Sequence, residues 1–126
     1  DDDIDQPFKT PAMLQKAGVL FTINDDDENT RSRNLAFNAG TAASYGLTKE
    51  EALSAITLNA ATILGIGDKA GSIETGKDAN MLVSEGDILD MRTNIIHNAF
   101  IQGRQIDLHN KQTQLAEKYE TKYGIK

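Results

Sequence analysis

Residues 18–27 read GVLFTINDDD, in which the unbroken apolar and β-branched run Val19–Ile23 precedes three aspartates. Strands covered on both faces, as in parallel sheets, show such runs without alternation between apolar and polar residues. The run therefore predicts a buried, parallel-type strand. In a (β/α)8 barrel the catalytic groups lie at the C-terminal ends of the strands, and Asp25, Asp26 and Asp27 occupy that place. The alternative is a solvated loop whose aspartates cap the following helix.

Helical patterns flank this strand on both sides. Residues 1–10 are acidic and unpatterned and predict a loop, after which residues 11–17 predict a short helix that starts at a proline. Apolar residues near helical spacing predict a helix over 30–45. A capping box that begins at Thr48 opens a second predicted helix, which runs to residue 64. No other parallel-type strand is visible in the sequence, so the strand at 19–23 needs neighbours that this chain does not supply.

Beyond Gly65 the pattern changes to short strands separated by turns. The predicted strands are 71–73, 80–83, 95–101 and 104–108. Gln102 and Gly103 form the turn of a hairpin between the last two strands. A final helix is predicted from Lys111. Its apolar residues Leu115, Tyr119 and Tyr123 share one face and are most simply a docking stripe.

Composition excludes several classes of protein. The chain has 126 residues, 39% of them hydrophobic and 25% charged, which is typical of a soluble globular protein. Its formal net charge is −6 and no basic face is visible, so a nucleic-acid partner is not expected. No apolar run approaches the roughly 20 residues that cross a bilayer, so no membrane partner is expected. The absence of cysteine excludes a thiolate zinc site, a disulfide scaffold and a cysteine nucleophile.

The acidic loop fails the test for a calcium site of the EF-hand type. Asp25, Asp27 and Asn29 match the first, third and fifth positions of such a loop. The sixth position is Thr30 instead of glycine, and the twelfth is Ala36 instead of glutamate. The turn and the bidentate ligand are therefore both missing.

Two other features favour ordinary structural roles. Residues 65–70, GIGDKA, match the letters of a dinucleotide-binding fingerprint. They follow a predicted helix and precede a predicted strand, so they lack the helix N-terminus that would hold a pyrophosphate, and they predict a helix end and a loop. His97 and His109 are twelve residues apart with no ligand motif between them, which favours ordinary surface or half-buried histidines.

Several segments together resemble one enzyme family. They are Gly18–Asp27, Leu47–Gly65 (LTKEEALSAITLNAATILG), Gly71–Val83 (GSIETGKDANMLV) and Ala99–Arg104 (AFIQGR). These segments resemble the C-terminal part of a metal-dependent amidohydrolase, and the most similar branch is that of the imidazolonepropionase-like and prolidase-like enzymes. The resemblance covers nearly the whole chain beyond residue 10. Asn80 departs from the pattern, because an aspartate is common there in the family.

The resemblance implies an α/β fold, a (β/α)8 barrel with a composite β-sandwich built from both chain ends. Residues 1–66 are expected to form the C-terminal end of the barrel domain, with a helix, the eighth strand and the closing helices. Residues 67–109 are expected to supply C-terminal strands of the sandwich, and 110–126 a C-terminal helix. The start of the chain, DDDID, has no methionine and no leader-like pattern, which favours the interior of a longer gene product.

The resemblance also implies a divalent metal, expected to be zinc, and an aspartate after the eighth strand that binds it and accepts a proton from water. Asp26 is the residue predicted for both roles. The family has a small residue just before that aspartate, where this chain has Asp25, so Asp25 and Asp27 are the alternatives. The family's other ligands include a His-x-His pair, which this chain lacks. The isolated chain is therefore expected to bind no metal and to be inactive.

The expected function of the full-length protein is hydrolysis of C–N bonds, in a small-molecule amide, a cyclic amide or a peptide-like substrate, by a metal-activated water. One alternative is a non-enzymatic interaction module that retains the sandwich, and another is an acidic-loop cation binder. The apolar strand at 19–23 predicts self-association, so a homo-oligomer is expected. The compartment stays open between the cytoplasm and a secreted or periplasmic location, since a signal peptide would precede these residues.

Overall fold

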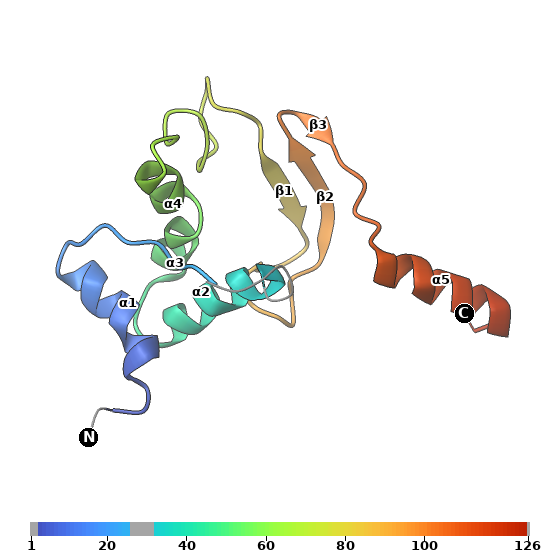
Figure 1. Cartoon of the computed structure of the whole chain (residues 1–126), viewed down its shortest axis with the longest axis horizontal. Helices are drawn as coiled ribbons and strands as arrows, with labels where there is room; N and C mark the ends of the chain where they lie inside the picture. Colours follow the sequence, from blue (N-terminus) through green and yellow to red (C-terminus); the bar gives the residue numbers. More distant parts are fainter. Residues whose placement is uncertain (1–2, 26–31, 126) are drawn as a thin grey trace.

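The computed structural model describes residues 3–25 and 32–125. Within these residues, four helices and a 3-10 turn come first, then three strands, then a last helix (Figure 1). The elements are α1 (Gln6–Lys16), the 3-10 turn (Ser32–Asn34), α2 (Leu35–Ser44), α3 (Lys49–Ala55), α4 (Leu58–Ile63), β1 (Met81–Ser84), β2 (Ile96–Ile101), β3 (Arg104–Gln105) and α5 (Lys111–Tyr123). Helices α1–α4 gather on one side, the sheet lies beside them, and α5 extends away from the sheet.

Helix α1 begins earlier than the sequence predicts, at Gln6 instead of Pro11. The predicted loop over 1–10 is therefore wrong from Gln6 onward. Pro7 lies in the first turn, where its missing N–H removes no helical hydrogen bond. The helix ends before Gly18, as predicted, and Gly18 adopts a left-handed φ of 71°.

The predicted strand at 19–23 is wrong as a hydrogen-bonded strand, because a strand needs a partner and no neighbouring strand lies beside it within the described residues. The segment instead lies against the end of α3, where the Ile23 amide donates to the Ala55 carbonyl (3.2 Å). The Phe21 side chain is buried there, while Val19 and Leu20 are 47% and 54% exposed. One face of this apolar segment is covered by helices and the other is open.

The predicted helix over 48–64 is two helices, α3 and α4, which meet at Thr57. Thr57 has φ −129° and ψ −90°, outside the helical region, and its hydroxyl donates to the Leu53 carbonyl (2.7 Å). This side chain satisfies a carbonyl at the end of α3 where the helix stops. The predicted capping box is confirmed, since Thr48 Oγ1 accepts from the Glu51 amide and the Glu51 carboxylate accepts from the Thr48 amide.

Helix α2 is shorter than the predicted helix over 30–45. It begins at Leu35, after a single 3-10 turn, and residues 26–31 lie outside the described part of the chain. Gly46 follows the helix with a φ of 125°, which confirms the predicted end. Gly65 likewise follows α4 with a φ of 73°, so residues 65–70 are a helix end and loop, as predicted.

Small side chains build most of the core. The buried apolar residues are Phe21, Ala39, Ala42, Leu47, Ala52, Ala55, Ala61 and Leu89. Alanines on α2, α3 and α4 let these short helices approach closely. Larger apolar side chains stay in water at many positions, for example Leu64 (73% exposed) and Ile73 (82% exposed). The described residues therefore leave open apolar surface that a further layer of structure would cover.

The three strands form an antiparallel sheet in the order β1-β2-β3. The predicted strands at 80–83 and 95–101 are confirmed to within one residue at each end, whereas the predicted strand at 104–108 is a strand only at Arg104 and Gln105. Gln102 and Gly103 both have positive φ, 50° and 75°, as a two-residue hairpin turn requires. The Asn80 side chain accepts from the Gln102 amide (2.8 Å) and so ties this turn to the start of β1.

The predicted strand at 71–73 is wrong, because this segment is fixed by contact with α4. Gly71 has a φ of 95°, and a Cβ built on it would lie 2.7 Å from Ala61 Cβ and 2.9 Å from Leu58 Cα. The backbone therefore passes directly over α4 at a position open only to glycine. Close packing on a helix replaces the strand pairing that the local sequence favours.

The loop between β1 and β2 connects the sheet to the helices. Leu89 of this loop is buried in the helical core, and its carbonyl oxygen lies so near Gly40 that a Cβ there would be 2.1 Å away. Asp87 supports the loop twice, by accepting from the Leu89 amide (2.9 Å) and by pairing with Lys49 (2.7 Å). The sheet is therefore positioned by backbone contact with α2.

Helix α5 begins at Lys111, as predicted, and Asn110 caps it by accepting from the amides of Gln112 (2.9 Å) and Thr113 (3.0 Å). It contacts no other helix or strand of the described chain. No helix in the described ranges has the length and apolarity needed to cross a bilayer.

Replacing Gly40 with alanine is expected to destabilise the fold by about 1–3 kcal/mol, because the added Cβ must displace the Leu89 carbonyl. Helix propensity alone predicts the opposite sign, a gain of about 1 kcal/mol. Urea unfolding, monitored by circular dichroism, measures the free energy of unfolding. Ser44→Ala, one turn later in α2, is the matched control and should change it by less than about 0.5 kcal/mol. A Gly40→Ala protein as stable as wild type would contradict this account of the loop.

Candidate functional site

Asp25 is the predicted site residue that the structure describes, since Asp26 and Asp27 lie outside the described residues. It is half-buried at the end of the segment that follows α1. Its Oδ1 accepts from Asn38 Nδ2 of α2 (3.1 Å). Its Oδ2 is buried and has no hydrogen-bond partner among the described residues. A buried carboxylate oxygen without a partner is costly, so this atom is suited to receive a proton donor or a cation.

The segment that carries Asp25 is clamped by side chains of α3 and α4. Asn59 Nδ2 donates to the Phe21 carbonyl (3.1 Å), and Ser54 donates to Asn59 Oδ1 (2.9 Å). Thr22 Oγ1 donates to the Ala55 carbonyl (2.7 Å). The Asn59 bond satisfies a backbone carbonyl that a neighbouring strand would otherwise satisfy, and the Ser54 and Thr22 bonds hold the Asn59 side chain and the segment in place.

Two residues of this arrangement, Asn38 and Asn59, are not among those that the sequence predicts. Asn59 lies inside the apolar run of α4, and an amide in such a run is a signal that it bonds to backbone in the interior. Asn38 gives no comparable signal, because an exposed asparagine in a helix is usually only solvated.

The described residues do not fit a metal site by themselves. No group of three or more histidine, aspartate or glutamate side chains that could hold a metal lies within 3–25 and 32–125. Zinc takes three or four protein ligands in most sites, whereas Asp25 offers a single carboxylate. This part of the chain can therefore contribute one ligand at most to a shared site.

Both histidines are exposed and paired with carboxylates, which confirms the prediction of ordinary surface residues. His97 Nε2 lies 3.2 Å from Glu85 Oε2. His109 Nδ1 lies 2.7 Å from Asp107 Oδ1, and its Nε2 lies 3.3 Å from Glu117 Oε1. Asp107 raises the pKa of His109, chiefly through this hydrogen bond. Each histidine is far along the chain from the aspartates of the acidic loop.

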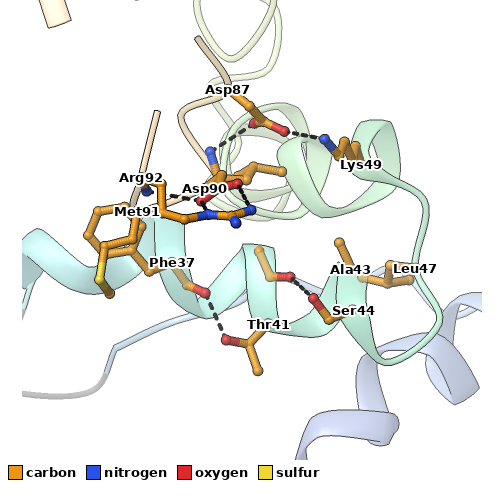
Figure 2. A pocket seen from close by; sticks show the side chains of 12 residues that line it. Phe37, Thr41, Ala43, Ser44, Leu47, Lys49, Asp87, Asp90, Met91 and Arg92 are labelled. Atoms are coloured by element: carbon orange, nitrogen blue, oxygen red, sulfur yellow. Dashed lines mark hydrogen bonds and ion pairs between the residues drawn. The ribbon is translucent and has the colours of Figure 1, made fainter. Parts of the chain in front are cut away.

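A groove of about 510 Å³ lies between α2 and the loop that joins β1 to β2 (Figure 2). Its charged groups are paired within the protein. Asp87 pairs with Lys49, which, together with the Leu89 amide, lowers the pKa of Asp87. Arg92 donates to both carboxylate oxygens of Asp90 and lowers the pKa of Asp90 to about 2. Asp25 does not line this groove, so the groove is a seam between helices and loop and is separate from the candidate carboxylate.

Comparison with known proteins identifies the family. The profile of the Amidohydrolase family matches residues 9–111. This chain belongs to the amidohydrolase family. The match begins within α1, continues through the acidic loop, the helices α2–α4 and the whole sheet, and stops where α5 begins.

Within the family, this amidohydrolase chain is similar to imidazolonepropionases. It is 36% identical over 86 residues to the imidazolonepropionase of Thermoplasma volcanium, covering 67% of this chain and 21% of the relative. It is 31% identical to that of Flavobacterium psychrophilum, covering 79% of this chain and 26% of the relative. The chain thus spans about a quarter of the length of these relatives.

Solved structures of amidohydrolases superpose on this chain. The amidohydrolase from Thermotoga maritima superposes with a TM-score of 0.73 at 36% identity, over 79% of this chain and 26% of that one. A prolidase complexed with N-methylphosphonate-L-proline (79% and 26% covered) and a zinc-bound adenosine deaminase from Xanthomonas campestris (87% and 32% covered) share the fold at 21% identity, with TM-scores of 0.62 and 0.61. The resemblance to imidazolonepropionase-like and prolidase-like amidohydrolases is confirmed.

Replacing Asn59 with alanine is expected to cost about 1–3 kcal/mol of folding free energy, because the Phe21 carbonyl loses its donor and Ser54 loses its acceptor in a part-buried place. Chemical unfolding measures the loss. Thr62→Ala, in the same helix, removes only a hydroxyl that bonds back to the Leu58 carbonyl on an exposed face and should stay within about 0.5 kcal/mol of wild type. Equal stability of the two variants would show that the Asn59 hydrogen bonds do not contribute to the free energy of unfolding.

Proposed function

We propose that this chain supplies the C-terminal part of a metal-dependent amidohydrolase that hydrolyses C–N bonds in a small amide or peptide-like substrate. The match over residues 9–111, together with the buried, unpartnered Oδ2 of Asp25, is the observation that supports this proposal best. In this proposal, residues 1–66 complete a (β/α)8 barrel, 67–109 contribute to a composite β-sandwich and 110–126 form a C-terminal helix.

The arrangement of residues 19–25 supports the barrel assignment. Helices α3 and α4 clamp one side of this segment, and its exposed Val19 and Leu20 leave the other side open. Neighbouring barrel strands would pair with the free backbone and cover these side chains. The carboxylates that follow the segment would then lie at the C-terminal mouth of the barrel, where such enzymes carry out their chemistry.

The chemistry requires ligands from outside this chain. A divalent metal, zinc in this proposal, makes its bound water acidic enough to attack at neutral pH. The chain contributes one aspartate, which would bind the metal and accept a proton from water for the leaving amine. Asp26 is the residue that the sequence resemblance favours. The orphaned oxygen of Asp25 and its orientation by Asn38 support Asp25 as the alternative.

The 126-residue chain alone is expected to show no turnover of amide, imidazolonepropionate or dipeptide substrates, with or without added zinc or manganese. One carboxylate holds a catalytic metal too weakly for activity. The assay uses chain purified under denaturing conditions and refolded, which removes host hydrolases. Metal-dependent turnover by that preparation would contradict the proposal that most metal ligands come from outside this chain.

A chimera tests the role of the aspartates. In it, the family-matched residues 9–111 replace the corresponding part of the Thermotoga maritima amidohydrolase, which is 36% identical to this chain over the 79% of the chain that superposes. The chimera is expected to bind zinc and hydrolyse an amide. Of Asp25→Asn, Asp26→Asn and Asp27→Asn, the one that removes the proton acceptor should lower kcat about 10²–10⁴-fold and lower zinc content. We expect that variant to be Asp26→Asn. The same loss in Asp25→Asn alone would identify Asp25 as the proton acceptor instead.

The other two substitutions are the matched controls, since each removes one negative charge from the same loop. If all three Asp→Asn substitutions had equally small effects on kcat and zinc content, the aspartates would be solvated loop residues that cap the following helix. That result would favour the non-enzymatic interaction module. A chimera that folds and binds zinc but turns over no amide would limit the proposal to metal binding.

A further inference from the structure

Helix α5 is joined to the sheet by a short connection, residues 106–110, which has no secondary structure (Figure 1). The connection is anchored at its start, because the Ile106 amide donates to the Ala99 carbonyl of β2 (2.9 Å). It is anchored at its end by Asn110, which caps α5. The helix itself contacts no other helix or strand of the described chain. The position of α5 relative to the sheet therefore depends on residues 107–109.

His109 contacts both the connection and the helix. Its backbone amide donates to Asp107 Oδ1 (2.9 Å), and its ring Nδ1 lies 2.7 Å from the same oxygen. Its ring Nε2 lies 3.3 Å from Glu117 Oε1, in the second turn of α5. The imidazole therefore bridges a residue next to the anchored Ile106 and a residue inside α5.

This bridge requires the protonated ring. A neutral imidazole has one N–H donor and one nitrogen that only accepts, whereas the imidazolium ion has two donors. Both ring nitrogens of His109 face carboxylate oxygens, which only accept when ionised. The His109 amide and ring lower the pKa of Asp107, so this carboxyl stays ionised near neutral pH. A neutral His109 ring can donate to Asp107 or to Glu117, but not to both.

The nitrogen that loses its partner on deprotonation is Nε2. The contact from Nδ1 to Asp107 is the shorter one, and the His109 amide holds the same carboxylate oxygen in place. Nδ1 therefore keeps the remaining proton, and the lone pair of Nε2 then faces the Glu117 carboxylate. Attraction between the ring and α5 becomes repulsion.

The charged and titratable groups around the ring come from the sheet, the connection and α5. A cavity of about 490 Å³ beside the ring is lined by His97 of β2, by Asp107 and by Glu117, while β3 contributes the uncharged Gln105. The His97 ring is itself paired with Glu85 (3.2 Å). Within the described residues, no lysine or arginine lines this cavity, so the carboxylates face the ring without a competing cation from those side chains.

The N-terminus of α5 opposes the positive ring, because a helix N-terminus carries about half of a positive charge. Two full negative charges, at 2.7 and 3.3 Å, outweigh it. The result is a raised pKa for His109, caused chiefly by the hydrogen bond to Asp107. The bridge is therefore complete below the ordinary histidine pKa of 6.5 and is lost as the pH rises through the raised value, close to neutral pH.

We propose that His109 is a pH-dependent tether for α5: the imidazolium ion holds the helix to the connection through Glu117, and loss of the ring proton releases α5 to move as an intact helix about residues 107–110. Exposed ion pairs are individually weak. Here a weak pair is sufficient, because α5 has no contact with another helix or strand of the described chain. The Asn110 cap contains no titratable group, so the helix itself persists after release.

Nuclear magnetic resonance of the ¹⁵N-labelled 126-residue chain tests the tether between about pH 5.5 and about pH 8.5. The chain has two histidines, so His97→Gln assigns the ring signal of His109. At the low pH the α5 amides are expected to have order parameters close to those of the sheet, about 0.85, and at the high pH below about 0.6. The midpoint of this change should coincide with titration of the His109 ring. Equal order of α5 at both pH values would overturn the proposal.

Matched substitutions separate the tether from a general effect of charge. Glu117→Gln should abolish the pH dependence of the α5 order parameters, whereas Glu120→Gln removes the same charge three residues later and should leave it unchanged. His109→Gln should leave α5 mobile at both pH values, and His97→Gln should keep the transition. A transition that survives in Glu117→Gln or His109→Gln would contradict the tether.

The ¹³Cα chemical shifts of α5 report whether the helix persists at the high pH. Helical shifts there would support release of an intact helix, and unwinding of α5 would overturn it. None of these readouts depends on hydrolytic activity or on a bound metal, so their failure is distinct from failure of the proposed function.

Discussion

The approach of the Leu89 carbonyl to Gly40 joins the sheet to the helices of this protein. No strand contacts a helix directly in the described chain, so the position of the sheet relies on the loop between β1 and β2. A side chain at residue 40 would push this loop away, and the Asp87 contacts to Lys49 and to the Leu89 amide would lose their geometry. The missing Cβ at Gly40 therefore allows the close approach by which this loop, with its buried Leu89 side chain and its Asp87–Lys49 pair, joins the sheet to the helices.

The second feature of the fold is that its core is small while its apolar surface is large. Alanines let α2, α3 and α4 pack closely, but they bury little area, and the stabilisation from burial is about 25 cal/mol per Å². Larger apolar residues are exposed on the segment 19–23, after α4, on the sheet and on α5. Such a distribution is typical of a segment that contributes layers to a larger barrel or assembly, and the chain's coverage of a quarter of its relatives agrees with it.

The candidate site is likewise positioned by a small number of hydrogen bonds. No described strand lies beside the segment that leads to Asp25, yet Asn59, Thr22 and the Ile23 amide tie it to the ends of α3 and α4. The carboxylate is thereby held at a defined place, with one oxygen bonded to Asn38 and the other buried and without a hydrogen-bond partner among the residues that the structure describes. In the proposed enzyme, the helices would position one ligand and the other ligands would come from residues outside this chain, which agrees with the absence of a metal-binding cluster within residues 3–25 and 32–125.

The sequence by itself determined the features that depend on neighbouring residues. These are the capping box at Thr48, the glycine-terminated helices, the turn at Gln102 and Gly103, the strands it connects, and the resemblance to amidohydrolases. Only the tertiary structure decided the features that depend on distant residues. The predicted strand at 19–23 has no strand to pair with in the described ranges, and Asn59, 38 residues from Phe21, bonds to its backbone instead. Gly71 passes over α4 where a strand was predicted, and the isolated oxygen of Asp25 follows from burial against α2. The physical reason is that a strand and a buried polar atom are defined by what lies opposite them, whereas a cap or a turn is complete within four residues.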